Sequence, residues 1–279
     1  MKVKLLLAMI SLSILARSTF ASEVEAVPVS PNVWHQAWDV LLKKYVNDRG
    51  LVAYGDWKRN QTDLSALDSY LKQFAEKPQT PASGNDAAAS LINLYNATTI
   101  HWILTNYPTE SIMGLKDSFG AKRHDIGGRK ASLDDIEHGT LRPLLGYRAH
   151  AVLVCAARSC PPLQRFAYAP SQLDAQIDSA YRAWLAREDL NRFLPNQRKI
   201  EISSIFNWFK DDFDKAGGTK KILAEYAPQQ YHDFLAGGNY EIGYLPYNWG
   251  LNDQSDHGKD YSRKQMIWDL IVNFLQFWK

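Results

Sequence analysis

Cysteine is scarce in this sequence, whose 279 residues include only Cys155 and Cys160, close together. Long runs of like charge and internal repeats are absent, so we expect neither a nucleic-acid-binding tail nor a repeat architecture. The His-Glu-x-x-His arrangement of the zinc proteases is missing as well, and we expect no metal and no other cofactor. These absences leave two thiols and a few polar side chains as the candidates for chemistry.

The first 21 residues have the composition of a secretory signal. Met1 to Lys4 is basic, Leu5 to Ala16 is almost entirely apolar, and Thr19 to Ala21 supplies small residues at the cleavage positions. The apolar run is too short to span a bilayer. We therefore expect cleavage near Ala21 and a periplasmic or secreted protein, with an N-terminal anchor as the alternative.

Cleavage also changes the charge of the chain. Once Lys2, Lys4 and Arg17 are removed, 32 basic residues become 29 against 30 acidic ones, so the net charge falls from +2 to −1. A mature chain with this balance has no electrostatic attraction to nucleic acid. Nucleic acid is therefore not an expected partner.

The rest of the sequence shows mostly helical periodicity, with a few short stretches typical of strands. Helices are predicted at 34–45, 63–75, 87–106, from 132 onward, 170–187, 203–213, 220–226, 229–236 and 262–279. Strands are predicted at 51–54, 150–155, 198–202 and 240–245, with a hairpin around Gly127-Gly128. This order predicts a helix-dominated α+β single domain. We expect an N-terminal helical segment at 22–49, a main domain at 50–252 and a C-terminal amphipathic helix at 253–279.

Two amides, Asn93 and Asn96, lie one turn apart on the predicted helix 87–106, which is apolar on nearly all other sides. A buried amide without a partner costs about 1–3 kcal/mol, so both side chains need hydrogen bonds. One interpretation is that they bond the carbonyls of a loop and fix a neighbouring turn. The other is that they line a polar pocket.

The segment Asp134-Asp-Ile-Glu-His138 follows a capping-box signature at Ser132. Asp134 and His138 are one helical turn apart, where a carboxylate orients an imidazole and raises its basicity. Asp135, three residues before His138, is a second carboxylate at helical spacing from the ring. The alternative is a solvated helix face without a functional role.

Five ordered blocks of sequence resemble the domain-of-unknown-function family 547. They are LINLYNATTIHWIL (91–104), DIGGRKASLDDIEHGTLR (125–142), HAVLVCAARSCPPL (150–163), ISSIFNWFKDDF (202–213) and IGYLPYNWGLN (242–252). The resemblance covers roughly residues 50–252. It implies a helix-then-strand order similar to papain-like and transglutaminase-like domains, at the level of fold alone, and no particular reaction.

The favoured interpretation of the cysteines is a disulfide between Cys155 and Cys160, because the two lie close together in a protein expected to be exported. Closing so short a loop contributes on the order of 2 kcal/mol and would display Arg158 and Ser159 at a pocket rim. One alternative is a pair of buried, inert thiols. The other is a catalytic Cys160, with His138 as base and Asp134 or Asn96 as orienting group. If the predicted strand 150–155 is regular, His150 and Cys155 point to opposite faces and cannot pair directly.

These expectations converge on one polar pocket, formed by the helix of the two asparagines, the helix of His138 and the segment 155–160, which we call the cysteine loop. The expected lining residues are Asn93, Asn96, Glu137, His150, Arg158 and Ser159. The sequence favours an exported ligand-binding or scaffold domain, and the alternative is a thiol-dependent hydrolase or acyl transferase using Cys160, His138 and Asp134. The helix at 264–279 is expected to dock on the domain core, or otherwise to contact a membrane surface or a partner protein.

Overall fold

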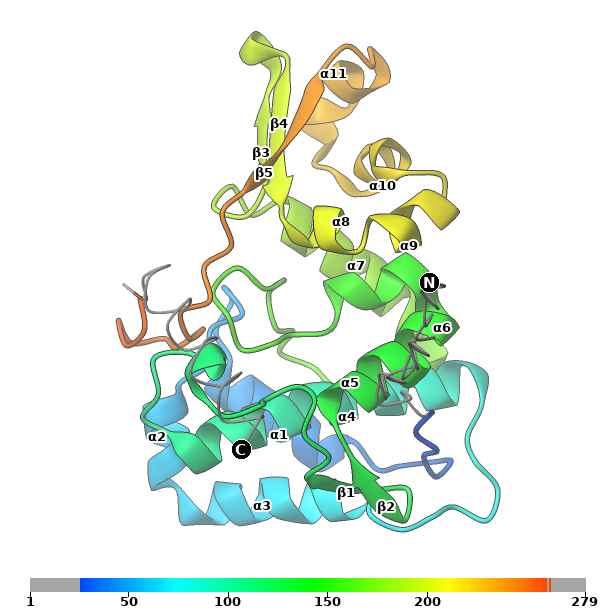
Figure 1. The fold of residues 1–279 in the computed structure, drawn as a ribbon, viewed down its shortest axis with the longest axis vertical. Coiled ribbons are helices and arrows are strands. Elements are labelled where there is room, and N and C mark those ends of the chain that lie inside the picture. The colour runs from blue at the N-terminus through cyan, green and yellow to red at the C-terminus, as the bar shows by residue number, and fades with distance from the viewer. Residues whose placement is uncertain (1–25, 260, 262–279) are drawn as a thin grey trace, which may run out of the picture.

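The computed structural model describes residues 26–259 and 261 (Figure 1). The predicted signal at 1–21 and the predicted closing helix at 264–279 lie outside the described residues. Within the described part, helices dominate, and the strands form one sheet of two strands and one of three. The predicted helix-dominated α+β class is confirmed.

Four helices form the base of the molecule in Figure 1: α1 (Gln36–Tyr45), α2 (Tyr54–Arg59), α3 (Gln61–Lys72) and α4 (Gly84–Asn106). The longest, α4, is buried along most of its length because apolar side chains occupy almost its whole circumference. It therefore serves as the central helix on which the other elements pack.

A short hairpin follows, as the sequence predicts. Strand β1 (His124–Ile126) pairs antiparallel with β2 (Arg129–Ala131). The turn between them uses Gly127 and Gly128, with φ of 60° and 81°, a combination typical of a two-residue hairpin loop. The predicted capping box is also present, with Ser132 and Asp135 bonding each other's backbone N–H groups at the start of α5 (Leu133–Ile136).

The helix that begins at α5 changes its winding before it ends. A π-helical turn at Glu137–Leu141 is followed by α6 (Arg142–Leu145) and by a 3-10 segment at Gly146–Ala151. The backbone N–H of Arg142 bonds the carbonyl of Glu137, which is the wider spacing of a π turn. Such single-turn bulges occur often at functional sites.

The upper part of Figure 1 holds the second sheet and the later helices. In chain order these are α7 (Leu173–Leu185), β3 (Arg192–Leu194), β4 (Lys199–Ser203), α8 (Ile205–Trp208), α9 (Lys210–Lys215), α10 (Thr219–Tyr226), α11 (His232–Ala236) and β5 (Glu241–Leu245). Strand β4 is central, antiparallel to β3 and parallel to β5. Single 3-10 turns lie at Ile112–Gly114, Pro170–Gln172, Pro195–Gln197 and Gln229–Tyr231.

The strand predicted at 150–155 is wrong. Residues up to Ala151 form the 3-10 segment, and the chain then turns without strand pairing until the isolated bridge of Ala157 with Leu251. A short apolar run is compatible with a buried helical turn as well as with a strand, so its apolar character did not distinguish the two. The argument that placed His150 and Cys155 on opposite faces of a strand therefore does not apply. The strand predicted at 51–54 is likewise reduced to isolated bridges of Val52.

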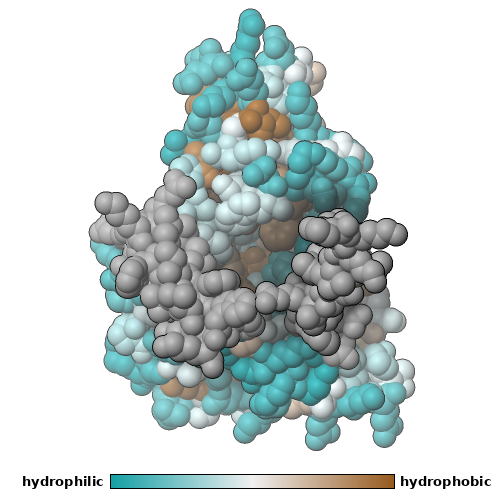
Figure 2. Space-filling model, in the orientation of Figure 1, coloured by the Kyte–Doolittle hydropathy of each residue, from teal (hydrophilic) through white to brown (hydrophobic). Residues whose placement is uncertain are grey.

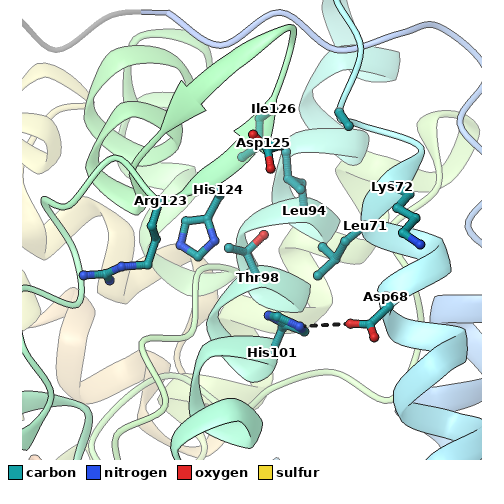
Figure 3. A pocket seen from close by; sticks show the side chains of 11 residues that line it. Asp68, Leu71, Lys72, Leu94, Thr98, His101, Arg123, His124, Asp125 and Ile126 are labelled. Carbon is teal, nitrogen blue, oxygen red and sulfur yellow. Dashed lines mark ion pairs between the residues drawn. The ribbon is translucent and has the colours of Figure 1, made fainter.

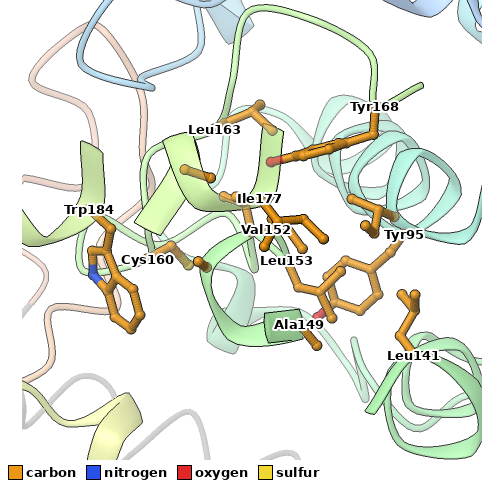
Figure 4. Close-up of a cluster of buried hydrophobic side chains, with 14 of the residues drawn as sticks. Tyr95, Leu141, Ala149, Val152, Leu153, Cys160, Leu163, Tyr168, Ile177 and Trp184 are labelled. Atoms are coloured by element: carbon orange, nitrogen blue, oxygen red, sulfur yellow. The ribbon is translucent and has the colours of Figure 1, made fainter. Parts of the chain in front are cut away.

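One large hydrophobic core connects the two parts of the domain. It includes residues of α1, α3 and α4 as well as residues of α7, β4 and α10. Figure 4 shows that Cys160 belongs to this core, in a cluster with Val152, Leu153 and Trp184. The cysteine loop is thus anchored in the core, and one side of it faces a cavity.

Candidate functional site

A cavity of about 250 Å³ lies where the π turn, the cysteine loop, α8 and the segment after β5 meet. Figure 2 shows a hollow with hydrophobic residues near the centre of this face, in the region where Figure 1 draws α5 and α8. The cavity is lined by Tyr95, Phe119, Asp134, Glu137, His138, His150, Leu153, Cys155, Cys160, Ile205, Trp208, Phe209, Tyr247 and Trp249. It therefore gathers both thiols, two imidazoles and two carboxyl groups.

The predicted disulfide between Cys155 and Cys160 is wrong, because both cysteines are free and their sulfurs are not at bonding distance. The loop turns so that Sγ of Cys160 meets the backbone N–H of Cys155, 3.1 Å away. The hydroxyl of Tyr247 lies 3.3 Å from Sγ of Cys155 and 3.2 Å from Sγ of Cys160. The two sulfurs therefore take part in a hydrogen-bonded group of three side chains.

The surroundings of the two thiols make Cys160 the more acidic one. Burial raises the pKa of Cys160, but hydrogen bonds from the Cys155 thiol, the Tyr247 hydroxyl and the backbone of Ala157 and Cys155 lower it below the ordinary value. The pKa of Cys155 is raised well above its ordinary value by its hydrogen bond to Cys160 and by burial. Cys160 is therefore the thiol that ionises first.

The π turn brings Glu137 and His138 to the same cavity. Burial raises the pKa of Glu137, although a hydrogen bond with the Tyr95 hydroxyl acts in the opposite direction. Burial is also the main reason that the pKa of Asp134 is raised. Glu137 lies close enough to Cys155 for its charge to raise the pKa of that thiol.

His138 is held by charged groups at both ring nitrogens. Its Nδ1 lies 3.0 Å from a terminal nitrogen of Arg142, and its Nε2 lies 3.7 Å from Oδ1 of Asp134. A guanidinium group only donates hydrogen bonds, so Nδ1 must accept and the ring proton must be on Nε2. In this tautomer His138 has no unoccupied lone pair with which to deprotonate a thiol.

The charged group that contacts a ring nitrogen of His150 is a carboxylate, whereas Nδ1 of His138 contacts a guanidinium. Its Nε2 lies 2.8 Å from Oδ2 of Asp212, and its ring stacks on Phe209 with the centroids 4.1 Å apart. Burial lowers the pKa of His150 to about 4, so the ring is neutral at neutral pH. Burial raises the pKa of Asp212, but hydrogen bonds from Arg142 and His150 bring it below the ordinary value.

The charge states of this pair fix the tautomer of the imidazole. An ionised Asp212 can only accept, so Nε2 of His150 donates and Nδ1 keeps its lone pair. The contact with Asp212 is made by Nε2, so it leaves Nδ1 unused. His150 is therefore the ring in this cavity whose Nδ1 carries an unprotonated lone pair that no charged group occupies.

The two amides of α4 lie outside the cavity lining and bind backbone groups instead. Asn96 donates to the carbonyl of Val152 and accepts from the N–H of Val154, both at 2.9 Å. Asn93 makes the same pair of bonds with Tyr168, at 2.8 Å and 2.9 Å. The interpretation in which the amides fix neighbouring turns describes this geometry, and Asn96 is not in place to orient His138.

Arg158 and Ser159 also lie outside the lining. The Arg158 side chain donates to the carbonyls of Asp253 and Ser255, and the Ser159 hydroxyl accepts from the backbone N–H of Asn248. These bonds tie the cysteine loop to the segment that follows β5. The loop is thereby held against Tyr247, which the same segment carries.

Two residues of the site, Asp212 and Tyr247, were not among the sequence candidates. Both belong to blocks that carried the family resemblance, 202–213 and 242–252. An acidic residue next to aromatic side chains in the first block was the available signal for Asp212. Nothing local in the sequence indicates that it meets His150, which is 62 residues away.

A second cleft, of about 320 Å³, lies between α3, α4 and β1. Figure 3 shows His101 pointing toward Asp68, 3.0 Å away, and His124 next to Arg123. The Arg123 guanidinium donates to three backbone carbonyls, so it stabilises the loop before β1. This cleft is larger than the cysteine cavity but contains no thiol, and we therefore place the candidate site at the cysteines.

In the part of the chain that the structure describes, no group of three or more histidine, cysteine or acidic side chains is arranged to hold a metal ion. Likewise, none of its helices combines the length and apolar composition needed to cross a bilayer.

The fold and the site define an α+β domain with a cavity that gathers thiol, imidazole and carboxyl side chains. Residues 80–185 match the model of the family described as "Protein of unknown function, DUF547", so the family resemblance seen in the sequence is confirmed. This stretch contains the cysteine loop, the π turn and α4. No curated protein and no solved structure matches the chain, and the papain-like or transglutaminase-like layout stays a prediction.

Proposed function

We propose that this protein is a thiol-dependent hydrolase or acyl transferase with Cys160 as its nucleophile. The observation that supports this most is the environment of one sulfur. Cys160 Sγ is unbonded to Cys155, accepts the Cys155 N–H at 3.1 Å and lies 3.2 Å from the Tyr247 hydroxyl. Hydrogen-bond donors around a sulfur stabilise the thiolate, which is the reactive form.

The base in this proposal is His150, and Asp212 holds its ring. The carboxylate binds Nε2–H at 2.8 Å and keeps the proton off Nδ1, the nitrogen that has to receive the thiol proton. His150 and Cys160 line the same cavity. In the alternative drawn from the sequence, His138 is the base and Asp134 or Asn96 its orienting group. In the structure, Nδ1 of His138 is occupied by Arg142.

The proposed reaction begins when the Cys160 thiol transfers its proton to Nδ1 of His150. The sulfur electron pair then forms a bond to a substrate carbonyl carbon, and the π electrons of the carbonyl move to its oxygen. Collapse of this tetrahedral intermediate breaks the bond to the leaving group, which takes the proton from His150. A thioester on Cys160 remains until water or a second nucleophile, deprotonated by His150, attacks it and releases the thiol.

Trapping the acyl group tests this proposal directly. The reduced protein is treated with p-nitrophenyl acetate, and intact-mass and peptide mass spectrometry locate the acetyl group. We expect one acetyl group, on Cys160, and its loss in Cys160→Ala. Cys155→Ala is the matched control, which removes the less acidic thiol of the same loop and should retain acylation of Cys160.

Two outcomes would contradict the proposal. One is acetylation at Cys155 alone, and the other is a Cys160 thiol that reacts no faster than free N-acetylcysteine. In either case the second candidate function, reversible ligand binding, would account for the cavity. The observation that favours binding is the aromatic lining formed by Trp208, Phe209, Tyr247 and Trp249.

The place of action is also a proposal. We propose that cleavage near Ala21 exports the protein to the periplasm or the medium, because residues 1–21 have the composition of a signal. N-terminal sequencing of the protein recovered from cell fractions tests this. An intact Met1 in the cytoplasmic fraction would contradict it.

A further inference from the structure

One side of the cavity is a wall of four aromatic residues, Phe119, Trp208, Tyr247 and Trp249, which we call the aromatic wall. The rings of Trp208 and Trp249 are nearly parallel, at 14°, with centroids 6.0 Å apart. Tyr247 contacts both, with centroid distances of 4.7 Å, and Phe119 meets Trp249 edge-on. Because these rings pack on one another, they form a preorganised apolar surface next to the two sulfurs.

Trp208 is partly outside this packing. Its exposed fraction is 48%, one of a few large apolar side chains this exposed in the described part of the chain. Unlike Trp34, which is 66% exposed, Trp208 also lines the cavity that contains Cys160. An exposed apolar side chain at the entrance of a cavity is a common mark of a ligand contact.

The charges around the cavity disfavour an anionic substrate. Its described lining includes Asp134 and Glu137 but no lysine or arginine. The guanidinium of Arg142, which lies over the ring of the lining residue Phe209, is bound to Asp212 and His138. A substrate carboxylate would therefore enter next to two acidic side chains without an available cation, which costs free energy.

The volume of the cavity bears on how much of an acyl group it can bury. The cavity measures about 250 Å³ and is open to solvent on one side, so it does not limit the total length of a bound chain. We expect a hexanoyl or benzoyl group to be buried in it and the end of a decanoyl chain to extend into solvent.

We propose that the acyl group transferred to Cys160 is uncharged and apolar, and that a part of it about the size of hexanoyl or benzoyl packs on the aromatic wall through Trp208. This inference rests on the proposed function, because it assigns the substrate class of that same thiol. The aromatic wall binds the acyl group, and Cys160, between the wall and the core, receives its carbonyl carbon.

A series of p-nitrophenyl esters tests the substrate class. The acyl groups are acetyl, butyryl, hexanoyl, decanoyl and the anionic succinyl, and each rate of Cys160 acylation is divided by the rate of free N-acetylcysteine with the same ester. The normalised rate should rise about fourfold per methylene up to hexanoyl, the factor expected for burial of one methylene, and should not rise further at decanoyl. The succinyl ester should react more slowly than the butyryl ester.

Trp208→Ala tests the assigned residue. We expect the ratio of the hexanoyl to the acetyl rate to fall roughly tenfold, because an apolar contact with the longer group is removed. Trp34→Ala, a change of another exposed tryptophan outside the cavity, is the matched control and should keep the wild-type ratio.

The possible failures can be told apart. If no ester acylates Cys160, the proposed function itself is wrong. If Cys160 is acylated but the normalised rates do not depend on acyl length, or if the succinyl ester reacts as fast as the butyryl ester, the substrate class is wrong while the thiol mechanism stands. An unchanged rate ratio in Trp208→Ala would exclude Trp208 as the contact.

Discussion

Oδ2 of Asp212 lies 2.8 Å from Nε2 of His150 and 2.7 Å from Nε of Arg142. A terminal nitrogen of the same guanidinium lies 3.0 Å from Nδ1 of His138. A single carboxylate thus positions one imidazole directly and the other through an arginine. The two histidines of the cavity therefore differ in whether a ring nitrogen can accept a proton. The lone pair of His150 Nδ1 is open, whereas that of His138 Nδ1 is used by Arg142.

Asp212→Asn should greatly reduce the acylation of Cys160. An amide can donate to Nε2 as well as accept from it, so the tautomer of His150 is no longer fixed and Nδ1 is protonated in part of the molecules. We expect the acylation rate with p-nitrophenyl acetate to fall about 100-fold or more, in line with the contribution of a positioned base. Stopped-flow release of p-nitrophenolate measures it.

The neighbouring exposed residue offers a matched control. Asp211→Asn makes the same chemical change one position away, on an exposed side chain, and should leave the acylation rate within about twofold of wild type. Equal losses in both variants, or an unchanged rate in Asp212→Asn, would show that Asp212 does not act through His150.

The features that the sequence predicted correctly are mainly those with a local cause. Gly127 and Gly128 adopt positive φ, which a two-residue hairpin needs, and Ser132 with Asp135 forms a capping box within four residues. The all-round apolar character of 87–106 likewise predicted a buried helix. Each of these depends on neighbours in the chain, so one sequence is enough.

The site depended on contacts that are distant in the chain, and here the sequence was less informative. The stretch 150–155 has too few residues for its periodicity to separate a strand from a helical turn. The pairing of His150 with Asp212 spans 62 residues, and Tyr247 meets Cys160 across 87. Cysteine spacing allowed a disulfide, but spacing alone does not set the direction in which a side chain points.

Tyr247→Phe should make Cys160 a weaker acid. The substitution removes a hydroxyl that lies 3.2 Å from the Cys160 sulfur and helps to lower its pKa. Because the thiolate is the reactive form, the pH at which iodoacetamide alkylation of Cys160 is half-maximal should move upward. The rate below that midpoint should fall roughly tenfold, the value of one hydrogen bond to a charged group.

Peptide mass spectrometry at a series of pH values separates Cys160 from Cys155 in this measurement. Tyr244→Phe, which removes a hydroxyl from an exposed ring on β5, serves as the comparison and should keep the wild-type profile. A Tyr247→Phe profile that coincides with wild type would show that the hydroxyl does not stabilise the thiolate.

Asn96→Ala should destabilise the fold because it leaves two buried backbone groups without partners. The carbonyl of Val152 and the N–H of Val154 both bond the Asn96 side chain. At about 1–3 kcal/mol for each unpaired group, the free energy of unfolding should fall by about 2–6 kcal/mol. Urea denaturation followed by tryptophan fluorescence measures this change.

Asn106→Ala is the comparison for that experiment, since the Asn106 side chain is half-buried and, among the described residues, bonds the Trp102 carbonyl of its own helix. Its loss should cost less than about 1 kcal/mol. If Asn96→Ala were no more destabilising than Asn106→Ala, the two hydrogen bonds of Asn96 would not stabilise the segment that leads into the cysteine loop.

His124, on the wall of the second cleft, should make the stability of the protein depend on pH. Burial is the main cause that lowers its pKa to about 4, and its Nε2 is buried without a partner among the described residues. The folded state therefore disfavours the charged ring, while the unfolded chain protonates near 6.5. The contribution of the neutral His124 ring to the free energy of unfolding is complete above about pH 6.5 and is lost as the pH falls toward 4. It amounts to on the order of 3 kcal/mol.

His124→Phe removes the titrating group and keeps a planar ring in the same place. The free energy of unfolding from urea denaturation should fall less between pH 7 and pH 4.5 in the variant than in wild type. At neutral pH the variant should be at least as stable, because an unpaired buried nitrogen is replaced by carbon. The variant also identifies the His124 signal in NMR spectra, and a His124 ring that titrates near pH 6.5 in the folded protein would contradict this account of the cleft.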